Sequence, residues 1–421
     1  MFRTLLRAGT VSINPVKPSV LGANGLAGSV VSAIDDPIEA NILVLGSDRN
    51  SLVLISCDLL YIGNSLRKIV ERALEDIVRP ENIFMGATHT HRAPMTDFSK
   101  PALGLADKEN VEHVAQAISS AVRRIYSFEK RRVSAEVGYG EHQAGINRRK
   151  KKLLSIRRFG LDFKAVGMGP NARGPIDNTV RRVRFRDSAD RTIAEMWTTA
   201  LHPTAYPARD RISADFPGQV RRGIREINGH QIPVIFFQGF SGDIRPKTRV
   251  TPFGLKRLLV GAEFAGFSRE EYFAWARSLV DAVLSVEFMT LGGNGQQSTR
   301  IPVTRELFVD GDVGPGEGFV HCIRLGELGL VGVPSEVVVE YSSTLRNEES
   351  HNQKNRHLWG IGCIDHVWGY SPTKRMLAEG GYEAGGFCVP FGVRNVSPNV
   401  ESDLRLVLEK AKFILFPEVD I

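Results

Sequence analysis

Two histidines one residue apart are the feature of this sequence best suited to chemistry at a metal ion. His89 and His91 lie in the run THTHRAP, directly after the short buried strand pattern of residues 82–88. On an extended chain, residues two apart point to the same face, so we expect the two rings to project together. One imidazole could bind a metal while the other takes a proton from bound water. Two histidines that cap a strand end through hydrogen bonds would give the same pattern.

Two more polar residues follow buried strand patterns in the same way. His202 follows residues 192–200, and Glu336 follows the apolar run LGLVGVP. Taken alone, each residue has a simpler structural explanation. His202 could be a hydrogen-bonded residue at a strand end, and Glu336 could lie in the first turn of a helix, where the helix dipole favours it. Tyr370 could simply pack in the core. His89, His202 and Glu336 nevertheless share the position at which α/β folds place their sites, so we expect them to contribute to one site.

Strand and helix patterns alternate along the chain, which predicts an α/β fold: a single large domain with mixed β-sheets flanked by helices and a metal site at strand ends. Strands are predicted at residues 8–13, 41–46, 52–60, 82–88, 133–139, 180–186, 192–200 and 232–238, and as a pair within 321–334. Helices are predicted at residues 64–77, 109–126, 217–227, 269–286, 335–347 and 402–415. Residues 144–179, rich in Gly, Pro and Arg, are predicted to form a long irregular loop.

The composition is that of an ordinary globular protein. Among 421 residues, 42% are hydrophobic and 24% are charged, which excludes the disordered and fibrous classes. The four cysteines form no CxxC pair, so nothing indicates a disulfide framework. The sequence shows neither a signal-peptide pattern nor a window near the roughly 18 apolar residues of a membrane span. We therefore expect a cytoplasmic protein without a transmembrane segment.

The formal net charge is +7, and the densest basic run is RRKKK at residues 148–152, followed by Arg157 and Arg158. Such a run is typical of a solvated loop or strand edge, and it could also bind an anionic substrate or a phosphate group. Neither a nucleic-acid-binding motif nor interleaved aromatic residues accompany it, so we expect no nucleic-acid partner.

The order and context of these residues resemble the catalytic domain of the neutral, non-lysosomal ceramidases. That family is marked by a strand ending in Asp, a THTHS-type turn, INRS, a histidine after a Trp-bearing strand, a DNKG-type turn, a QxxxGD loop, a strand ending in PGE and a paired YxTT…YEG segment. The matching segments follow the family's order over nearly the whole chain: Cys57-Asp58, Thr88-His89-Thr90-His91, Gly145-Ile146-Asn147-Arg148, Trp197 with His202-Pro203-Thr204, Ser213-Ala214-Asp215, Gln238 with Gly242-Asp243, Val333-Pro334-Ser335-Glu336, Tyr370-Ser371-Pro372-Thr373 and Tyr382-Glu383.

The resemblance implies a role for each matched position. It implies that one Zn²⁺ per chain is held by His89, His202, Glu336 and Tyr370. His91 would act as general base and acid, and Arg148 and Tyr382 would stabilise the oxyanion of a tetrahedral intermediate. The three aspartates Asp58, Asp215 and Asp243 would orient the ligands from behind, although each could instead cap a turn.

Four departures from the family pattern bear on the substrate. The chain lacks a secretion signal, and it ends about where the catalytic domain would. We therefore expect residues 1–421 to form one ceramidase-like catalytic domain, without the family's C-terminal immunoglobulin-like domain. Gly239 and Phe240 replace the serine and asparagine of the QSN-type loop, and INRSP has become INRRKKK. We expect a zinc-dependent amidohydrolase acting on a small-molecule N-acyl compound, either ceramide-like or smaller and more polar or anionic.

Two other readings use the same residues. A zinc site of this kind could hydrolyse an ester or a lactone, or form an amide or a lactam. The chain could also be a non-catalytic binding module. The nitrogen and oxygen ligands suit zinc, and nickel, cobalt or iron could occupy the same site. The acyl chain, the amine and the oligomeric state do not follow from the residues.

Overall fold

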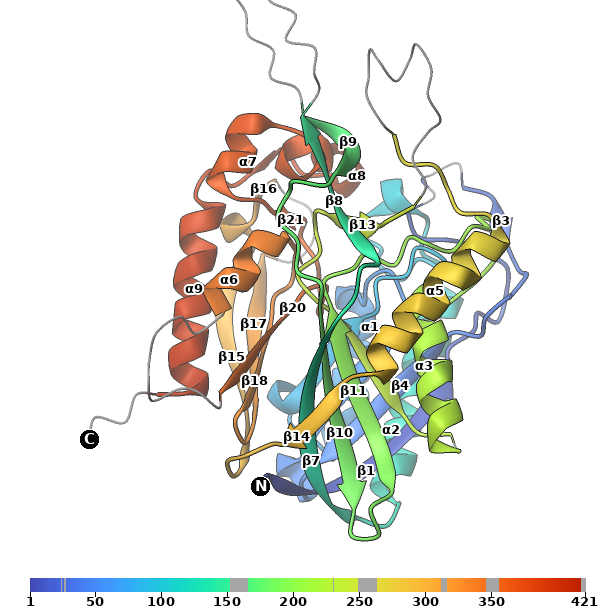
Figure 1. Cartoon of the computed structure of the whole chain (residues 1–421), viewed down its shortest axis with the longest axis vertical. Helices are drawn as coiled ribbons and strands as arrows, with labels where there is room; N and C mark the ends of the chain where they lie inside the picture. The colour runs from blue at the N-terminus through green and yellow to red at the C-terminus, as the bar shows by residue number, and fades with distance from the viewer. Residues whose placement is uncertain are drawn as a thin grey trace, which may run out of the picture.

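The computed structural model describes residues 1–23, 25, 28–151, 166–229, 231–248, 263–311, 316–345 and 356–417. These residues form four layers, in the order helices, large sheet, small sheet, helix (Figure 1). The large sheet has nine strands. Eight of them follow one another in the order β12 (Val234–Gln238), β11 (Thr192–Thr199), β10 (Thr179–Asp187), β7 (Arg131–Glu141), β1 (Arg3–Ser12), β4 (Glu39–Leu45), β5 (Leu52–Cys57) and β6 (Ile83–Ala87). The ninth, β14 (Glu287–Thr290), also pairs with β7. The pairs β5–β6 and β11–β12 are parallel and the others are antiparallel.

The small sheet has four strands, in the order β15 (Gln296–Thr304), β17 (Glu317–Leu325), β18 (Leu328–Gly332) and β20 (His357–Ile361). Only the pairing of β18 with β20 is parallel. Both sheets are therefore mixed, which confirms the predicted α/β class with mixed sheets flanked by helices.

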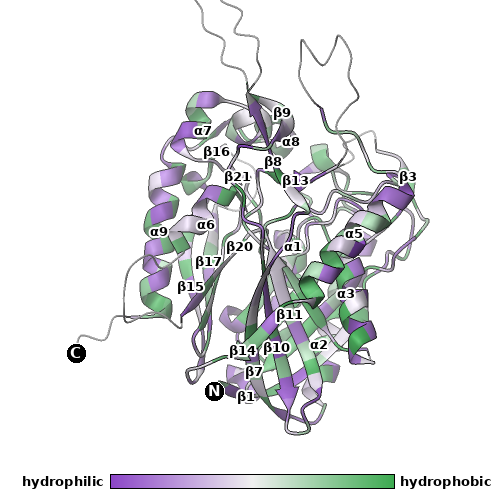
Figure 2. Ribbon diagram, viewed as in Figure 1, coloured by the Kyte–Doolittle hydropathy of each residue, from purple (hydrophilic) through white to green (hydrophobic). Residues whose placement is uncertain are grey.

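Alternation along the strands builds the layers. In β4, Leu43 and Leu45 pack toward the small sheet, whereas Ile42 and Val44 pack toward the helices. The helices α1 (Asn64–Leu74), α2 (Lys108–Tyr126), α3 (Asp215–Asn228) and α5 (Arg269–Leu284) cover the large sheet, and α9 (Val400–Leu415) covers the small sheet. Figure 2 shows hydrophilic and hydrophobic bands alternating along α3, α5 and α9, as expected for helices that bury one face.

Short elements gather near the carboxyl ends of the parallel strands. They are β8 (Gly145–Lys151), β9 (Val166–Asn171) and β13 (Ile244–Pro246) in one sheet, the pairs β19 (Glu336–Val337) with β21 (Tyr370–Ser371) and β16 (Val309–Asp310) with β22 (Asn395–Val396), and the helices α6 (Ser342–Leu345), α7 (Lys374–Glu379) and α8 (Cys388–Phe391). A separate pair joins β2 (Ser19–Val20) and β3 (Val30–Val31), and single helical turns of 3₁₀ type lie at Asp48–Asn50, Pro80–Asn82, Pro101–Leu103, Arg305–Leu307 and Val339–Tyr341. In Figure 1, β8, β13 and β21 lie at the same end of the molecule.

Two sequence predictions are wrong. Residues 335–347 are not one helix, because Glu336 and Val337 pair with a distant segment and only Ser342–Leu345 is α-helical. Three consecutive valines at 337–339 also disfavour a helix there. Residues 144–179 are not wholly irregular, because β8 and β9 pair with each other and β8 pairs with β13.

Residues 152–165, with Arg157 and Arg158, lie outside the described residues. Among the described helices, none is both long enough and apolar enough to cross a membrane.

Candidate metal centre

His89 and His91 lie just beyond the end of β6, but not on an extended chain. His89 has a φ of 67°, in the left-handed region that residues other than glycine rarely adopt. Its backbone N–H donates to the carbonyl of Leu59 at 2.9 Å, which fixes this turn. The expected alternation is therefore wrong, yet the two rings do come together, with centroids 5.2 Å apart. Strained backbone of this kind is common where a side chain must be aimed at a site.

His202 and Glu336 converge on His89. The Nε2 atoms of His89 and His202 are 3.0 Å apart, and Glu336 Oε2 lies 3.4 Å from the first and 3.8 Å from the second. All three side chains are buried. They come from the ends of different strands, with His202 after β11 and Glu336 a few residues after β18. The structure thus brings together the three strand-end residues that the sequence singled out.

The arrangement fits a transition-metal ion. His89 Nδ1 is hydrogen-bonded to the carbonyl of Leu60 at 2.9 Å, and His202 Nδ1 lies 3.4 Å from the carbonyl of Ser241, so the Nε2 atoms are left to face each other. Glu336 Oε2 and His91 Nε2 are buried and have no hydrogen-bond partner within the described part of the chain. Buried polar atoms without partners are uncommon, and a bound cation would satisfy them.

The charges at the site also suit a cation. Burial acts to raise the pKa of Glu336, but His89, with Tyr370 and Tyr61, holds that pKa below its usual value, so the carboxylate is ionised. Burial and the neighbouring His89 lower the pKa of both His91 and His202 well below the usual value. Burial acts to lower the pKa of His89, but Cys363 and the Glu336 carboxylate hold that pKa well above its usual value, so metal binding at His89 would displace a proton. His202 and Glu336 already have the neutral and ionised forms that a metal ligand requires.

His91 stands close enough to belong to the same cluster. One ring nitrogen from each of His89, His91 and His202 lies within 4.8 Å of the others. The geometry therefore allows His91 either to bind an ion directly or to act on a molecule beside it. Metal content in a His91 variant distinguishes these two roles.

Tyr370 reaches the site because β21 pairs in parallel with β19, where Tyr370 is the register partner of Glu336. Burial and the Glu336 carboxylate raise the pKa of Tyr370 well above its usual value, so the phenol is protonated beside that carboxylate. A phenolate ligand at this position would form only with the charge of a bound metal beside it. The Tyr370 ring lies 5.5 Å from the ring of Tyr382, which brings the second matched tyrosine to the same place.

Arg148 is the buried cation of the site. Its guanidinium carbon lies 5.5 Å from the ring centroids of both Tyr370 and Tyr382, and its Nε donates to Glu383 at 2.7 Å. Its Nη2 is buried and has no hydrogen-bond partner among the described residues. Arg149 donates to the second oxygen of Glu383 at 2.7 Å. The start of the basic run is therefore not a solvated rim, because Glu383 pairs with both arginines inside the protein.

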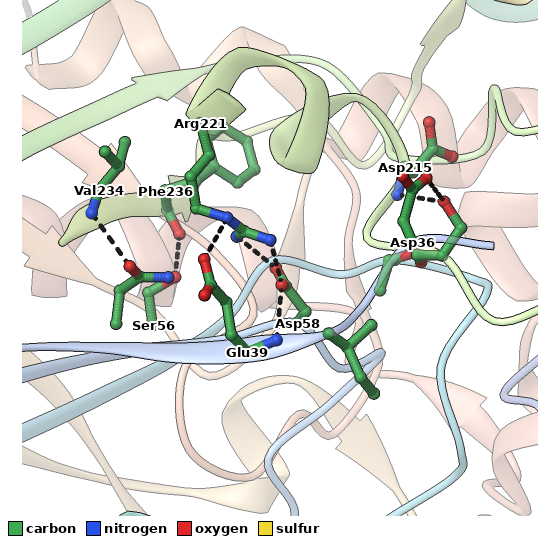
Figure 3. A network of polar contacts seen from close by, with 12 residues as sticks. Asp36, Glu39, Ser56, Asp58, Asp215, Arg221, Val234 and Phe236 are labelled. Carbon is green, nitrogen blue, oxygen red and sulfur yellow. Dashed lines mark hydrogen bonds and ion pairs between the residues drawn. The ribbon is translucent and has the colours of Figure 1, made fainter. Parts of the chain in front are cut away.

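The three matched aspartates hold the segments around the site, and Figure 3 shows two of them, Asp58 and Asp215. Asp58 accepts two hydrogen bonds from Arg221, at 3.2 and 2.8 Å, and Arg221 also pairs with Glu39. Asp215 accepts from the backbone N–H groups of Ala205 and Tyr206 at 2.9 and 3.0 Å, which fixes the turn after His202.

Asp243 acts in the same way on the other side of the site. Its carboxylate accepts from Asn147 at 2.7 Å and from the N–H of Val339 at 2.8 Å, and its carbonyl accepts from the N–H of Arg148 at 2.8 Å. The side-chain partners of these three aspartates include residues of β4, β8 and α3 as well as loop residues, and the hydrogen bonds described here go to none of the four expected ligands.

Two neighbours of the site were missed in the sequence. Tyr61 donates to Glu336 Oε1 at 2.5 Å, and it lies three residues after the matched Asp58. Arg245 lies two residues after the matched Asp243, and its positive charge contributes to the lowered pKa values of His91 and His202. Proximity to the matched motifs was the only signal for either residue.

The two positions that replace the family's QSN-type loop serve packing. Phe240 is buried, and a side chain at Gly239 would lie 2.7 Å from the carbonyl of Thr199.

No family model and no curated protein sequence matches the chain. Among solved structures, the chain is similar to the neutral ceramidase from Pseudomonas aeruginosa, with a TM-score of 0.73 and 15% identity over 98% of this chain and 75% of that one. The chain has a neutral ceramidase-like fold. A structure described as ceramidase complexed with C2 matches almost equally, with a TM-score of 0.72, 15% identity and the same coverage. The ceramidase-like fold confirms the resemblance read from the motifs, whereas the roles of the individual residues stay predictions.

Proposed function

We propose that this chain is a metal-dependent amidohydrolase of the ceramidase kind. One observation carries the proposal: His89, His202 and Glu336 converge in a ceramidase-like fold, with Tyr370 paired to Glu336. These four residues would hold one zinc ion. A bound zinc ion would supply Lewis acidity, which acidifies water and polarises a carbonyl group.

The residues around the ligands supply the remaining chemistry. His91 is buried enough to be neutral at physiological pH, so its free nitrogen can accept a proton from water and return it to a leaving amine. Arg148 and Tyr382 would donate hydrogen bonds to the oxygen on which negative charge develops. The hydrogen bond from Arg148 Nε to Glu383, at 2.7 Å, helps to hold the guanidinium in one orientation.

An anionic N-acyl compound is the substrate class that we propose. Arg148 and Arg149, at the start of the basic run, are buried and paired with Glu383, so they do not form an exposed anion-binding surface. Arg245 supports this proposal, because among the described residues its side chain contacts the Met168 sulfur at 3.5 Å and the Phe264 ring at 5.2 Å. Burial and the nearby Arg148 lower the pKa of Arg245 to about 10, as expected for a cation in a positively charged surrounding. The expected cytoplasmic location and the single catalytic domain stay predictions.

Metal content and turnover together test the proposal. Elemental analysis of the wild type should find about one zinc per chain, and the double variant His89→Ala, His202→Ala should lose it while it still folds. His113→Ala, on α2, is the control and should retain the metal. Hydrolysis of a panel of N-acyl amines, esters and lactones, with product analysis, then separates amidase from esterase or lactonase activity. A wild-type protein that takes up no metal would contradict the proposal.

A further inference from the structure

Tyr61 lies closer to the Glu336 carboxylate than His89 or His202 does. It follows β5, its side chain is buried, and its hydroxyl donates to Glu336 Oε1 at 2.5 Å. The two oxygens of this carboxylate therefore differ. Oε1 accepts a hydrogen bond, whereas Oε2 has no hydrogen-bond partner among the described residues and faces the two imidazoles at 3.4 and 3.8 Å.

The Tyr61 ring is held on several sides. It lies 5.3 Å from the ring of His89 and 6.0 Å from that of Phe391. The ammonium group of Lys100 lies 5.5 Å from the ring centroid of Tyr61, and this buried lysine is paired with Asp97. A buried ion pair beside the ring leaves little room for it to turn, because moving Lys100 would expose a charge to an apolar surrounding.

The backbone at Tyr61 is also fixed. Its carbonyl accepts from Thr96 Oγ1 at 2.6 Å. Gly63, two residues later, has a φ of 76°, and a side chain there would lie 3.0 Å from the Cα of Asp97. The segment after β5 is therefore clamped against residues 96–100, which aims the Tyr61 hydroxyl at Glu336 before any ligand binds.

We propose that Tyr61 is a positioning residue that keeps Glu336 a one-oxygen ligand, with Oε1 held by the phenol and Oε2 left for the metal. This inference rests on the proposed function, since it needs a metal at the site. A carboxylate can bind a metal through one oxygen or through both, and the second mode takes a coordination position that water or substrate would otherwise use.

Cobalt(II) is the probe for this arrangement, because its visible absorption is strong in four-coordinate sites and weak at higher coordination numbers. The experiment compares the metal-loaded wild type with Tyr61→Phe, which keeps the ring and removes the hydroxyl. We expect the cobalt band of the variant to weaken as Glu336 binds through both oxygens. Zinc affinity, measured by competition with a chromophoric chelator, should fall by about 10- to 100-fold, the usual effect of losing a hydrogen bond to a metal ligand. Tyr272→Phe removes an equally buried hydroxyl on α5 and should change neither quantity.

A double-mutant cycle shows whether Tyr61 acts through Glu336. In the Glu336→Ala background, Tyr61→Phe should have no further effect on zinc affinity, whereas a merely structural role would give additive losses. Should Tyr61→Phe fail to fold, fluorotyrosine at position 61 keeps the hydroxyl as a stronger donor and must shift the cobalt spectrum. Identical spectra and affinities in wild type and variants would overturn the role of Tyr61 and leave the metal site intact. A wild type that binds neither ion would overturn both proposals.

Discussion

Glu336 and Tyr370 are register partners in a two-stranded parallel pair, although they are far apart in the sequence. Register partners in a pleated pair point to the same side, so the carboxylate and the phenol lie together. The pair is reinforced where the N–H of Glu336 donates to the carbonyl of Gly369 at 2.9 Å and where Ser335 Oγ lies 2.6 Å from Ser371 Oγ. The carboxylate and the phenol are therefore placed by backbone pairing rather than by loop packing.

His91→Ala should separate the two roles that the geometry allows for this histidine. If His91 moves protons, the variant retains its zinc and its kcat falls by roughly 10²- to 10⁴-fold, the usual contribution of a general base. Elemental analysis and steady-state kinetics on the same preparation check this. Loss of the metal together with activity would instead make His91 a ligand.

Arg245→Ala should discriminate between charged and neutral substrates. With N-acyl compounds that carry a carboxylate, we expect KM to rise by about 10- to 100-fold, because a hydrogen bond to a charged group is worth about 1.5–3 kcal/mol. Neutral N-acyl amines should show little change. Arg3→Ala, an exposed arginine at the first residue of β1, is the control. Equal effects on both substrate classes would argue against an anion-binding role.

Glu383→Ala should destabilise the fold strongly. The substitution leaves the buried guanidinium groups of Arg148 and Arg149 without their shared carboxylate, and breaking a buried pair costs about 3–5 kcal/mol. Urea unfolding of the variant measures the loss. Glu340→Ala removes one of the two carboxylates that pair with the half-exposed Arg375 and should cost at most about 1 kcal/mol. Similar losses in the free energy of unfolding for the two variants would contradict the strong stabilisation that we assign to the buried pairs of Glu383.

Asp365→Asn should change the pH dependence of stability. Both carboxylate oxygens of Asp365 lack a hydrogen-bond partner among the described residues, and burial raises the pKa of Asp365 to about 6. Because the pKa is raised in the folded state, the contribution of Asp365 to stability is complete below about pH 4 and is lost as the pH rises through about 6.

Relative to the wild type, Asp365→Asn should therefore gain up to about 3 kcal/mol in the free energy of unfolding between about pH 4 and pH 7. Urea titrations of both proteins at several pH values, without added metal, check this. A stability difference that does not vary with pH would show that Asp365 is neutral or paired throughout.

Local patterns in the sequence were enough to predict the buried strands that precede His89, His202 and Glu336. The strands before His89, His202 and Glu336 are apolar runs that end in a polar residue, and such a run is a local property of the chain. The helices at 109–126 and 402–415 were also predicted nearly to their observed bounds, α2 at Lys108–Tyr126 and α9 at Val400–Leu415, because their apolar spacing repeats over several turns.

Other features were decided only by contacts between distant segments. The segment from Glu336 is a strand because Tyr370 pairs with it, and Arg148 is buried because Glu383 neutralises it. The turn that aims His89 depends on the carbonyl of Leu59, and the oxygen that Glu336 offers depends on Tyr61. Local pattern specifies which face of an element is apolar. The pairing of charges and hydrogen bonds depends on which elements meet, and that is settled only when the two sheets pack together.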